Sequence, residues 1–463
     1  MLRPQPMPDY FAEEALLLEG WARDVRLCVS NDGMIDSVAP NASSIGAMRL
    51  SGPVIPGMAN VHSHAFQRAM AGLAERASPA GDNFWSWREV MYGFAGRITP
   101  DDLHAIAAQL FVELLRHGYT SVGEFHYLHN QPGGAPYETR AEMSIQVVEA
   151  ARQAGIAITH LPVIYAFGGF GEQPLEDAQT RFEADPAHAL GIAADLNTRY
   201  RDDACVIVGV APHSLRAVNL SMLRDAVAGL PNLNPGAPIH IHIAEQATEV
   251  DDCLAWSGQR PIQWLESNVS LDNRWCLIHV THALDEELES VAASGAVVGL
   301  CPTTEANLGD GVFGLESFAA ASGRFGIGSD SNVSVSPVEE LRWLEYCQRL
   351  RSHQRNVVAT KGNPSSGAFL WCAAAEGGAR ALAQPAGSIA AGRRADLVVL
   401  DPDSPILTAK AGDQILDALI FSGSDNAVEG VMVGGRWVVE NGHHPEEERT
   451  AAEYRRVMRK LVS

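Results

Sequence analysis

Residues 54–70 read VIPGMANVHSHAFQRAM, a short apolar run that ends in two histidines separated by one residue. Its β-branched and apolar residues predict a buried strand over Val54–Val61. A doubly wound open sheet usually carries a glycine-rich phosphate turn after its first strand, and none follows here. The strand instead ends in His62 and His64, and the i, i+2 spacing puts both imidazoles on the same face.

Seven further runs of this kind follow along the chain, and amphipathic stretches separate several of them. Asp101–Gly118 and Tyr137–Gly155 are two such stretches, and both read as helices. Eight strands over about 275 residues, each followed by a helix or a long loop, predict an α/β fold built as a (β/α)8 TIM-like barrel. The seven runs are Thr120–Phe125, Thr159–Ala166, Cys205–Ala211, Pro238–Ala244, Trp275–Val280, Ala296–Cys301 and Phe325–Ser329.

The two ends of the chain differ from this middle. Near the N-terminus, DVRLCVSNDGMIDSVAP predicts a hairpin that turns at Asn31-Asp32-Gly33. From about 388 to 440, short β-like runs are joined by Gly and Pro turns. We therefore expect a small β-sandwich domain made of residues 1–55 and about 385–463, which ends in a C-terminal helix, and a barrel over residues 56–384.

Composition narrows the class of protein. The chain has 463 residues, 46% of them hydrophobic and 19% charged, so it can bury a large core. Its net charge of −22 argues against nucleic acid and against an anionic membrane as partners. No apolar run reaches membrane-spanning length and the N-terminus lacks a signal-peptide core. The seven cysteines lie singly without a CxxC motif, which favours a reducing cytoplasm over a disulfide framework.

Histidine and aspartate recur where the predicted strands end. His242 ends the run IHIHIAE, His279 ends LIHVTH, and Asp330 follows GIGS. Active sites of such barrels are built at the C-terminal ends of the strands. A single buried histidine is usually a hydrogen-bonded core residue, but five such groups, counting His62 and His64, at the ends of four strands indicate a metal site.

Three imidazoles and one carboxylate suit a divalent transition metal, with zinc as the first choice and iron or manganese as alternatives. Such an ion lowers the pKa of a bound water towards about 7. The fourth strand, CVIVGVAPHS, has no lysine that could bridge two ions, so one metal per chain is expected. His240 and His242 share the same strand parity. His242 lies nearer the strand end and begins an HxxE motif with Glu245, so it is the predicted ligand.

Several motifs together resemble the amidohydrolase superfamily: VIPGMANVHSHAFQRAM, HIHIAEQ, LIHVTH, GIGSDSN and GSIAAGRRADLVVLDPDSP. The HxxE motif and the histidine of the sixth strand are similar to the aminohydrolases of this superfamily that use one metal. The resemblance implies that His279 orients the attacking water and that Glu245 carries its proton to the departing nitrogen. The metal ligands that it implies are His62, His64, His242 and Asp330. Asp330 would also accept a proton from the attacking water. The resemblance further implies a homodimer.

Local motifs narrow the resemblance to iminohydrolases of N-formimino-L-glutamate: HSHAFQRAMAG, FWSWREVMY, SVGEFHYLH and APHSLRAV. This resemblance implies hydrolysis of a small anionic amidine to N-formyl-L-glutamate and ammonia in histidine degradation. The two carboxylates of that substrate suit arginine, whose planar fork pairs with them bidentately. The resemblance assigns substrate binding to Gln67, Arg88, Tyr127, His213 and Arg216.

Two other functions fit part of the pattern. A guanine-like or pterin-like ring could be deaminated by the same metal centre, although a flat neutral ring does not need two arginines. A non-catalytic scaffold on this fold would commonly lose the metal-site residues, and this chain retains all six of the metal and acid–base groups. The segment CPTTEANLGDG, residues 301–311, contains no evident ligand and is expected only to shape the mouth of the pocket.

Overall fold

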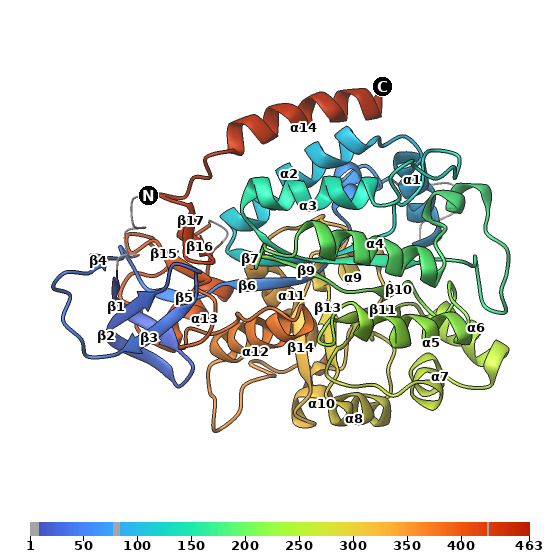
Figure 1. Cartoon of the computed structure of the whole chain (residues 1–463). Helices are drawn as coiled ribbons and strands as arrows, with labels where there is room; N and C mark the ends of the chain where they lie inside the picture. The colour runs from blue at the N-terminus through green and yellow to red at the C-terminus, as the bar shows by residue number, and fades with distance from the viewer. Residues whose placement is uncertain (1–8, 77–83, 424–425) are drawn as a thin grey trace.

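Two hydrogen-bonded sheets organise the chain in the computed structural model, which describes residues 9–76, 84–423 and 426–463. One sheet is a parallel barrel formed by the middle of the chain. The other combines strands from both termini and lies beside the barrel, where the blue and red ends of the chain meet (Figure 1). The predicted barrel with a small β unit from both ends is therefore confirmed.

The barrel has eight strand positions, as predicted, and neighbouring strands run parallel. The fourth position, predicted as one strand over Cys205–Ala211, consists of two short pieces. Bridges Val210↔Ile239 and Ser214↔His242 close the barrel between this position and the fifth strand. The strands are β6 (Met58–Ser63), β7 (Tyr119–His126), β8 (Ala157–Ile164), β9 (Val206–Val208) with β10 (Ala211–Pro212), β11 (Ile239–Ile243), β12 (Trp275–His279), β13 (Val297–Leu300) and β14 (Arg324–Ile327).

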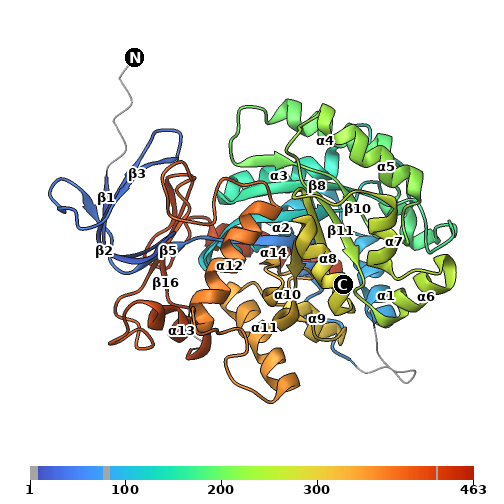
Figure 2. The same cartoon turned by 90° about the horizontal axis from the view of Figure 1, so that it is seen from below.

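Burial on both faces explains the nearly continuous apolar character of these strands, because side chains fill the barrel and helices cover its outside. Every residue of β7 and β8 is buried. Figure 2 shows the helices arranged around the barrel. They are α1 (Phe84–Ala95), α2 (Pro100–Arg116), α3 (Glu142–Ala154), α4 (Pro186–Arg199), α5 (Leu220–Gly229), α6 (Ala247–Ser257), α7 (Pro261–Asn268), α8 (Asp285–Ser294), α9 (Pro302–Leu308), α10 (Leu315–Ala320), α11 (Pro337–Ser352) and α12 (Ser366–Ala381), with the 3-10 helices η1 (Ala65–Met70), η2 (Asp177–Phe182) and η3 (Leu230–Asn232).

Local signals set the ends of these helices. Thr99 accepts a hydrogen bond from the Asp102 amide, and the Asp102 carboxylate accepts one from the Thr99 amide, so α2 begins with a capping box. At the C-terminal end of α3, Gly155 has a left-handed φ of 80° and terminates the helix. The Gly155 cap ends α3 directly before β8, which begins at Ala157.

The first predicted strand, Val54–Val61, is divided in the structure. Its first part, β5 (Val54–Pro56), pairs with strands of the terminal sheet, and its second part begins the barrel as β6. Gly57 lies between them, where a Cβ would collide with the side chain of Thr120. Its amide donates to Asp396 O at 3.0 Å. The chain thus crosses from one sheet to the other at a point that only glycine fits.

The terminal sheet interleaves the two ends of the chain. Its N-terminal hairpin turns at residues 31–33, as predicted. Tyr10, Leu27 and Leu397 belong to a separate buried cluster that forms its core. The domain limits at about 55 and 385 remain predictions. The strands occur in the order β17 (Arg436–Val439), β16 (Val428–Val433), β15 (Leu397–Leu400), β5, β1 (Tyr10–Leu17), β2 (Gly20–Val29) and β3 (Ile35–Ala39), with β4 (Met48–Arg49) paired to β1.

Two helices follow strands of the terminal sheet: α13 (Asp413–Phe421) comes after β15, and α14 (Glu447–Val462) comes after β17. Helix α13 packs against α12, and α14 lies across α2 (Figure 1). Lys460 Nζ contacts Asp102 Oδ2 at 2.6 Å, and Thr450 donates to Gln109 Oε1 at 2.9 Å. Within the described ranges, no helix has both the length and the apolar character to cross a membrane. All seven cysteines are free thiols.

Candidate active site

Four of the predicted residues meet at the C-terminal edge of the barrel. His62 Nε2 lies 3.2 Å from His64 Nε2 and 3.0 Å from His242 Nε2. Asp330 Oδ1 lies 3.5 Å from His62 Nε2 and 3.3 Å from His64 Nε2. All four side chains are buried. The sequence places them at the end of β6 or just after it, on β11 and just after β14, and the fold brings these strand ends together.

The hydrogen bonds around this cluster show that its atoms are mostly acceptors. His64 Nδ1 donates to Phe125 O and His242 Nδ1 donates to His213 O, each at 2.9 Å. A carbonyl oxygen only accepts, so both rings turn the lone pair of Nε2 towards the cluster. His62 Nε2 can donate to one neighbour at most, and Asp330 adds a carboxylate oxygen. The four residues therefore fit a bound divalent cation, because their lone pairs and the carboxylate oxygen point towards one place with no positive charge between them.

Strand parity alone does not distinguish His240 from His242 as the predicted ligand, but their hydrogen-bond partners do. His240 Nε2 donates to Ala381 O at 2.8 Å, which accounts for its buried ring. His242 turns its Nε2 to the histidine pair on β6 instead. His240 is thus a hydrogen-bonded core residue in this geometry.

A buried polar network holds Asp330 beside the histidines. The Asp330 amide donates to His62 O at 2.9 Å, and the His64 amide donates to Asp330 O at 3.0 Å. Asn332 Nδ2 also donates to Asp330 O and to His64 O. Asp330 has a left-handed φ of 46°, a conformation that persists in a non-glycine residue only when its surroundings enforce it. The loop after β14 is therefore fixed by contacts with the loop after β6.

His279 lies between three carboxylates. Its Nδ1 donates to Glu305 Oε1 at 3.2 Å. Its Nε2 lies 3.9 Å from Glu245 Oε1 and 3.9 Å from Asp330 Oδ2. The bond to Glu305 fixes the ring and directs Nε2 into the gap between the other two carboxylates. Glu305 is a site residue that the sequence analysis missed, because CPTTEANLGDG was expected to contribute only to the pocket mouth.

Glu305 also belongs to a second group of potential ligands with His279 and Cys301. Hydrogen bonds already account for this group. Glu305 Oε1 accepts the Cys301 amide at 2.8 Å as well as the His279 ring nitrogen. Burial raises the pKa of the Cys301 thiol well above its usual value, with negative charge on Asp330 and Glu305 adding to the effect. The group is a support for His279 in this geometry.

Burial and charge divide the titrating groups of the site into two kinds. Burial lowers the pKa of His62 and of His242 well below the usual value, and the neighbouring imidazoles lower both further. Both rings are therefore neutral at pH 7, the form that binds metals. Burial also opposes protonation of His279, but Glu245, Glu305 and Asp330 outweigh it and raise its pKa to about 10. Burial raises the pKa of Glu245 above its usual value, and the positive charges of His279 and Arg216 oppose this shift.

A small cavity of about 70 Å³ opens over the metal-ligand cluster. All five residues predicted to bind substrate line it, although they come from η1, α1 and the segments that follow β7 and β10. The sequence analysis missed several other lining residues, most of them aromatic. Tyr165 directly follows β8, a position that could have indicated it, whereas the others come from the helices α1, η2 and α9. The predicted lining residues are Gln67, Arg88, Tyr127, His213 and Arg216, and the missed ones are Met91, Tyr92, Tyr165, Phe182 and Leu308. Trp87 also lines the cavity.

Arg216 Nε and Gln67 Oε1 are buried in this cavity and lack a hydrogen-bond partner among the described residues. Gln67 Nε2 donates to the Tyr127 hydroxyl at 2.7 Å, which leaves its carbonyl oxygen available. A buried guanidinium nitrogen and a buried amide oxygen without partners are costly unless a ligand satisfies them. The cavity thus offers a cationic donor and a neutral acceptor to a small polar molecule.

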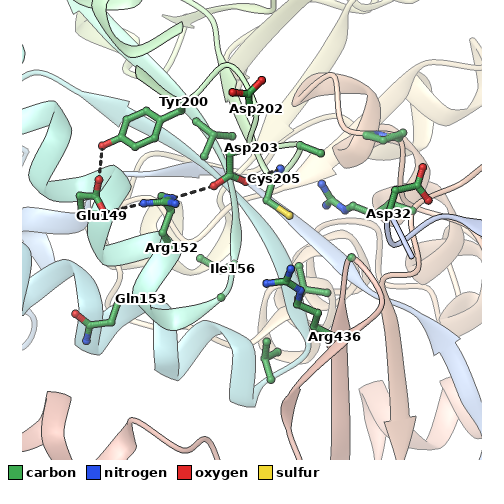
Figure 3. Close-up of a pocket in the computed structure, with 18 of the residues that line it drawn as sticks. Asp32, Glu149, Arg152, Gln153, Ile156, Tyr200, Asp202, Asp203, Cys205 and Arg436 are labelled. Carbon is green, nitrogen blue, oxygen red and sulfur yellow. Dashed lines mark hydrogen bonds and ion pairs between the residues drawn. The ribbon is translucent and has the colours of Figure 1, made fainter. Parts of the chain in front are cut away.

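A larger cavity lies elsewhere, at the N-terminal ends of the barrel strands, and holds about 960 Å³. Figure 3 shows that Arg152 in its wall pairs with Glu149 and Asp203. Arg152 contacts Glu149 at 3.0 Å and Asp203 at 2.8 Å, and the Tyr200 hydroxyl donates to Glu149 at 2.8 Å. The possible metal-ligand groups in the described ranges both lie at the opposite end of the barrel. The small cavity is therefore the candidate active site.

Comparisons with known proteins agree with this arrangement. A model of the "Amidohydrolase family" matches residues 54–438, and a model of "Formimidoylglutamate deiminase HutF, N-terminal domain" matches residues 9–51. Formimidoylglutamate deiminase from Pseudomonas aeruginosa is 51% identical over 98% of this chain and 100% of that protein. An 8-oxoguanine deaminase from the same species is 29% identical over 87% of this chain and 85% of that protein.

A solved structure matches the fold at similar length. The crystal structure of an amidohydrolase from Brucella melitensis superposes with a TM-score of 0.93 and 44% sequence identity, and the match covers 99% of this chain and 100% of that one. The motifs at the strand ends, the barrel and these matches agree with one another. The chain belongs to the amidohydrolase family.

Proposed function

We propose that the chain hydrolyses N-formimino-L-glutamate to N-formyl-L-glutamate and ammonia, as a step of histidine degradation. The observation that carries this proposal is the 51% identity to a formimidoylglutamate deiminase over 98% of the chain. The match of residues 9–51 to the N-terminal domain of that enzyme supports it independently of the barrel. In the reaction, water adds to the formimino carbon and the C–N bond to the terminal nitrogen breaks, so one water is consumed and one ammonia is released.

We assign the metal site to His62, His64, His242 and Asp330, with one divalent ion per chain. Three imidazole nitrogens and one carboxylate suit zinc, with iron and manganese as alternatives. Such an ion supplies hydroxide at neutral pH by lowering the pKa of a bound water. The converging lone pairs of the neutral histidines support this assignment.

The proton transfers fall to the carboxylates of this chain. Asp330 accepts the proton of the attacking water, and His279 Nε2, 3.9 Å from Asp330 Oδ2, orients that water. Glu245, whose pKa is raised by burial, carries a proton to the nitrogen that leaves as ammonia. Two carboxylates in different environments can thus divide the roles of base and acid.

The substrate contacts are proposed for the five predicted lining residues. The guanidinium groups of Arg88 and Arg216 suit the two carboxylates of the substrate. Gln67 Oε1, which is buried without a partner in the described part of the chain, suits the cationic amidine as an acceptor. Tyr127 and His213 complete the wall of the cavity near the metal ligands.

Deamination of a guanine-like ring is the alternative, and the 29% identity to an 8-oxoguanine deaminase is the observation in its favour. The two functions make different demands on the cavity. A flat ring fills it without needing a carboxylate partner, whereas the buried Arg216 Nε is satisfied by an anion. The cationic lining and the higher identity favour the dicarboxylate.

An ammonia-release assay on the purified protein tests the function. The panel contains N-formimino-L-glutamate, N-formimino-L-aspartate, guanine and a simple amidine, each with the zinc-loaded protein. We expect N-formimino-L-glutamate to give the highest kcat/KM by at least about tenfold, because it alone places both carboxylates and the amidine at matching distances. Faster release from guanine would replace this proposal with the alternative.

The cellular location and the assembly are also proposals. We place the enzyme in the cytoplasm, because all seven cysteines are free and a reducing compartment keeps them so. The family resemblance supports a homodimer. Light scattering coupled to size-exclusion chromatography tests the assembly, and a mass close to one chain of 49.7 kDa would contradict it.

A further inference from the structure

Two tyrosine hydroxyls without an assigned role lie in the wall of the active-site cavity. Tyr92 comes from α1 and Tyr165 follows β8, and both side chains line the cavity. They are 7% and 8% exposed. Gln179 of η2, which is 1% exposed, contacts both hydroxyls and is absent from the cavity lining. Three separate segments of the chain thus meet at one polar cluster.

Backbone contacts fix the orientation of the Gln179 amide. Its Oε1 accepts the amide proton of Glu176 at 2.9 Å, in the capping arrangement that begins η2. The other end of the amide, Nε2, therefore faces the tyrosines. It lies 3.2 Å from the Tyr92 hydroxyl and 3.0 Å from the Tyr165 hydroxyl.

This orientation determines the direction of both hydrogen bonds. An amide nitrogen has two protons and no available lone pair, so Gln179 donates to Tyr92 and to Tyr165. Each tyrosine oxygen is then an acceptor, and its own proton needs another partner. Among the described residues, no acceptor is found for either proton. Both hydroxyls consequently have a proton to donate to a molecule in the cavity.

The charge around these hydroxyls identifies the class of that molecule. The Arg88 guanidinium lies 5.3 Å from the centre of the Tyr92 ring. Arg216 lines the same cavity, with its Nε buried and without a partner in the described part of the chain. Two hydroxyl donors next to two guanidinium groups form a site for a carboxylate. Burial also raises the pKa of Tyr92 and of Tyr165, so both keep their protons at neutral pH.

We propose that Tyr92 and Tyr165 donate hydrogen bonds to one carboxylate of the substrate, and that Gln179 is the positioning residue that turns both hydroxyl protons into the cavity. The identity of the substrate rests on the proposed function, whereas the carboxylate site rests on the contacts above. The tyrosines therefore contribute to selectivity for a dicarboxylate over substrates with one carboxylate. A neutral ring gains nothing from this pair of donors.

The tyrosines are tested with Tyr92→Phe, Tyr165→Phe and the double variant, with Tyr346→Phe at a partly exposed site on α11 as the control. Each is assayed with N-formimino-L-glutamate, with N-formimino-L-glutamine and with 4-(formimino)aminobutyrate, which lack one carboxylate each. We expect each single variant to lose about tenfold in kcat/KM on the full substrate, mostly through KM. On the analogue that lacks the carboxylate bound by the tyrosines, the loss in kcat/KM should be only about twofold. An equal loss on all three substrates, or no loss, overturns the proposal.

Gln179 is tested by reversing the hydrogen bonds at nearly constant shape. Gln179→Glu still accepts the Glu176 amide, but its second oxygen draws the tyrosine protons towards residue 179 and away from the cavity. Gln179→Met removes the donor and leaves the hydroxyls free to rotate. We expect a rise in KM of at least about tenfold for the first variant and of about threefold for the second. Equal effects of the two variants would contradict the positioning role of Gln179.

Binding of a simple dicarboxylate separates this proposal from the proposed function. Calorimetry with glutarate measures affinity without turnover. We expect the zinc-loaded wild-type protein to bind glutarate about tenfold more tightly than Tyr165→Phe, even if N-formimino-L-glutamate proves not to be the substrate. If the protein does not turn over N-formimino-L-glutamate but the wild type still binds glutarate more tightly than Tyr165→Phe, only the proposed function is rejected. Equal or absent glutarate binding in both proteins rejects the tyrosine site.

Discussion

The Nδ1–H of His279 is held by Glu305 Oε1 at 3.2 Å, and both side chains are buried. The same oxygen accepts the Cys301 amide, so the carboxylate is anchored to the start of α9. The opposite ring nitrogen of His279 faces Glu245 and Asp330. Glu305 therefore sets the direction of the ring that we assign to orienting water.

This relationship predicts the effect of changing Glu305. Glu305→Ala should lower kcat by about 10- to 100-fold and change KM by less than about threefold, because the His279 ring loses its partner while the substrate contacts remain. Glu305→Gln keeps an accepting oxygen and should retain more activity than Glu305→Ala. Steady-state kinetics on N-formimino-L-glutamate measures both. Asn307→Ala, at an exposed position of the same helix, is the control, and a KM effect in Glu305→Ala larger than its kcat effect would contradict the assignment.

Sequence patterns predicted the residues whose position follows from strand geometry. His62 and His64 share a strand face by their spacing, and Asp330 follows a strand end, so their convergence at one edge of the barrel was predictable. Glu305 was not predictable in this way. It lies on a short helix after β13, and its contact with His279 depends on how that helix turns back over the barrel. No spacing rule connects the two positions.

The aromatic wall of the cavity was missed for a similar reason. Tyr92 and Gln179 come from α1 and η2, which are far apart in the chain and meet only because both cover the barrel mouth. The split of the first strand at Gly57 is also a tertiary effect. An apolar run has the same appearance whether it stays in one sheet or crosses between two, and only the close approach of Thr120 reveals the crossing.

Arg216 provides the test of substrate charge. Its buried Nε lacks a partner among the described residues, so we expect an anionic group of the substrate to pair with it. Arg216→Met should lower kcat/KM on N-formimino-L-glutamate by about 100-fold or more and leave any activity on guanine nearly unchanged. Arg216→Lys keeps the charge but loses the planar fork, so it should recover only part of the activity. A similar loss on both substrates would mean that Arg216 acts on the fold of the site.

Removal of the metal tests the histidine cluster. Dialysis against a chelator should abolish ammonia release, and titration with zinc should restore it at about one ion per chain. His242→Ala should bind zinc at least about tenfold more weakly, whereas His240→Ala should keep the wild-type metal content because His240 bonds to Ala381 O. Elemental analysis of the purified proteins measures the stoichiometry. Two ions per wild-type chain would contradict the single-metal site.

His160 on β8 predicts a pH dependence of stability that is independent of catalysis. It is fully buried, and neither ring nitrogen has a protein partner in the described ranges. Burial lowers its pKa to about 3, with His129 adding to the effect. In the unfolded chain the imidazole of His160 has a pKa near 6.5, whereas in the folded chain it stays neutral down to about pH 3. Folding stability therefore decreases as the pH falls from about 6.5 towards 3.

Replacing this residue should flatten that dependence. Between pH 7 and pH 5.5, His160→Leu should lose about 1 kcal/mol less stability than the wild-type protein, because one proton uptake on unfolding disappears. The leucine also removes two unpaired ring nitrogens, so its stability at pH 7 should equal or exceed that of the wild type. Urea unfolding at several pH values measures both effects, with His443→Leu at an exposed histidine as the control. The same decline with pH in His160→Leu and in the wild type would show that His160 takes up its proton in the folded state, with a water or a rearranged neighbour as the partner.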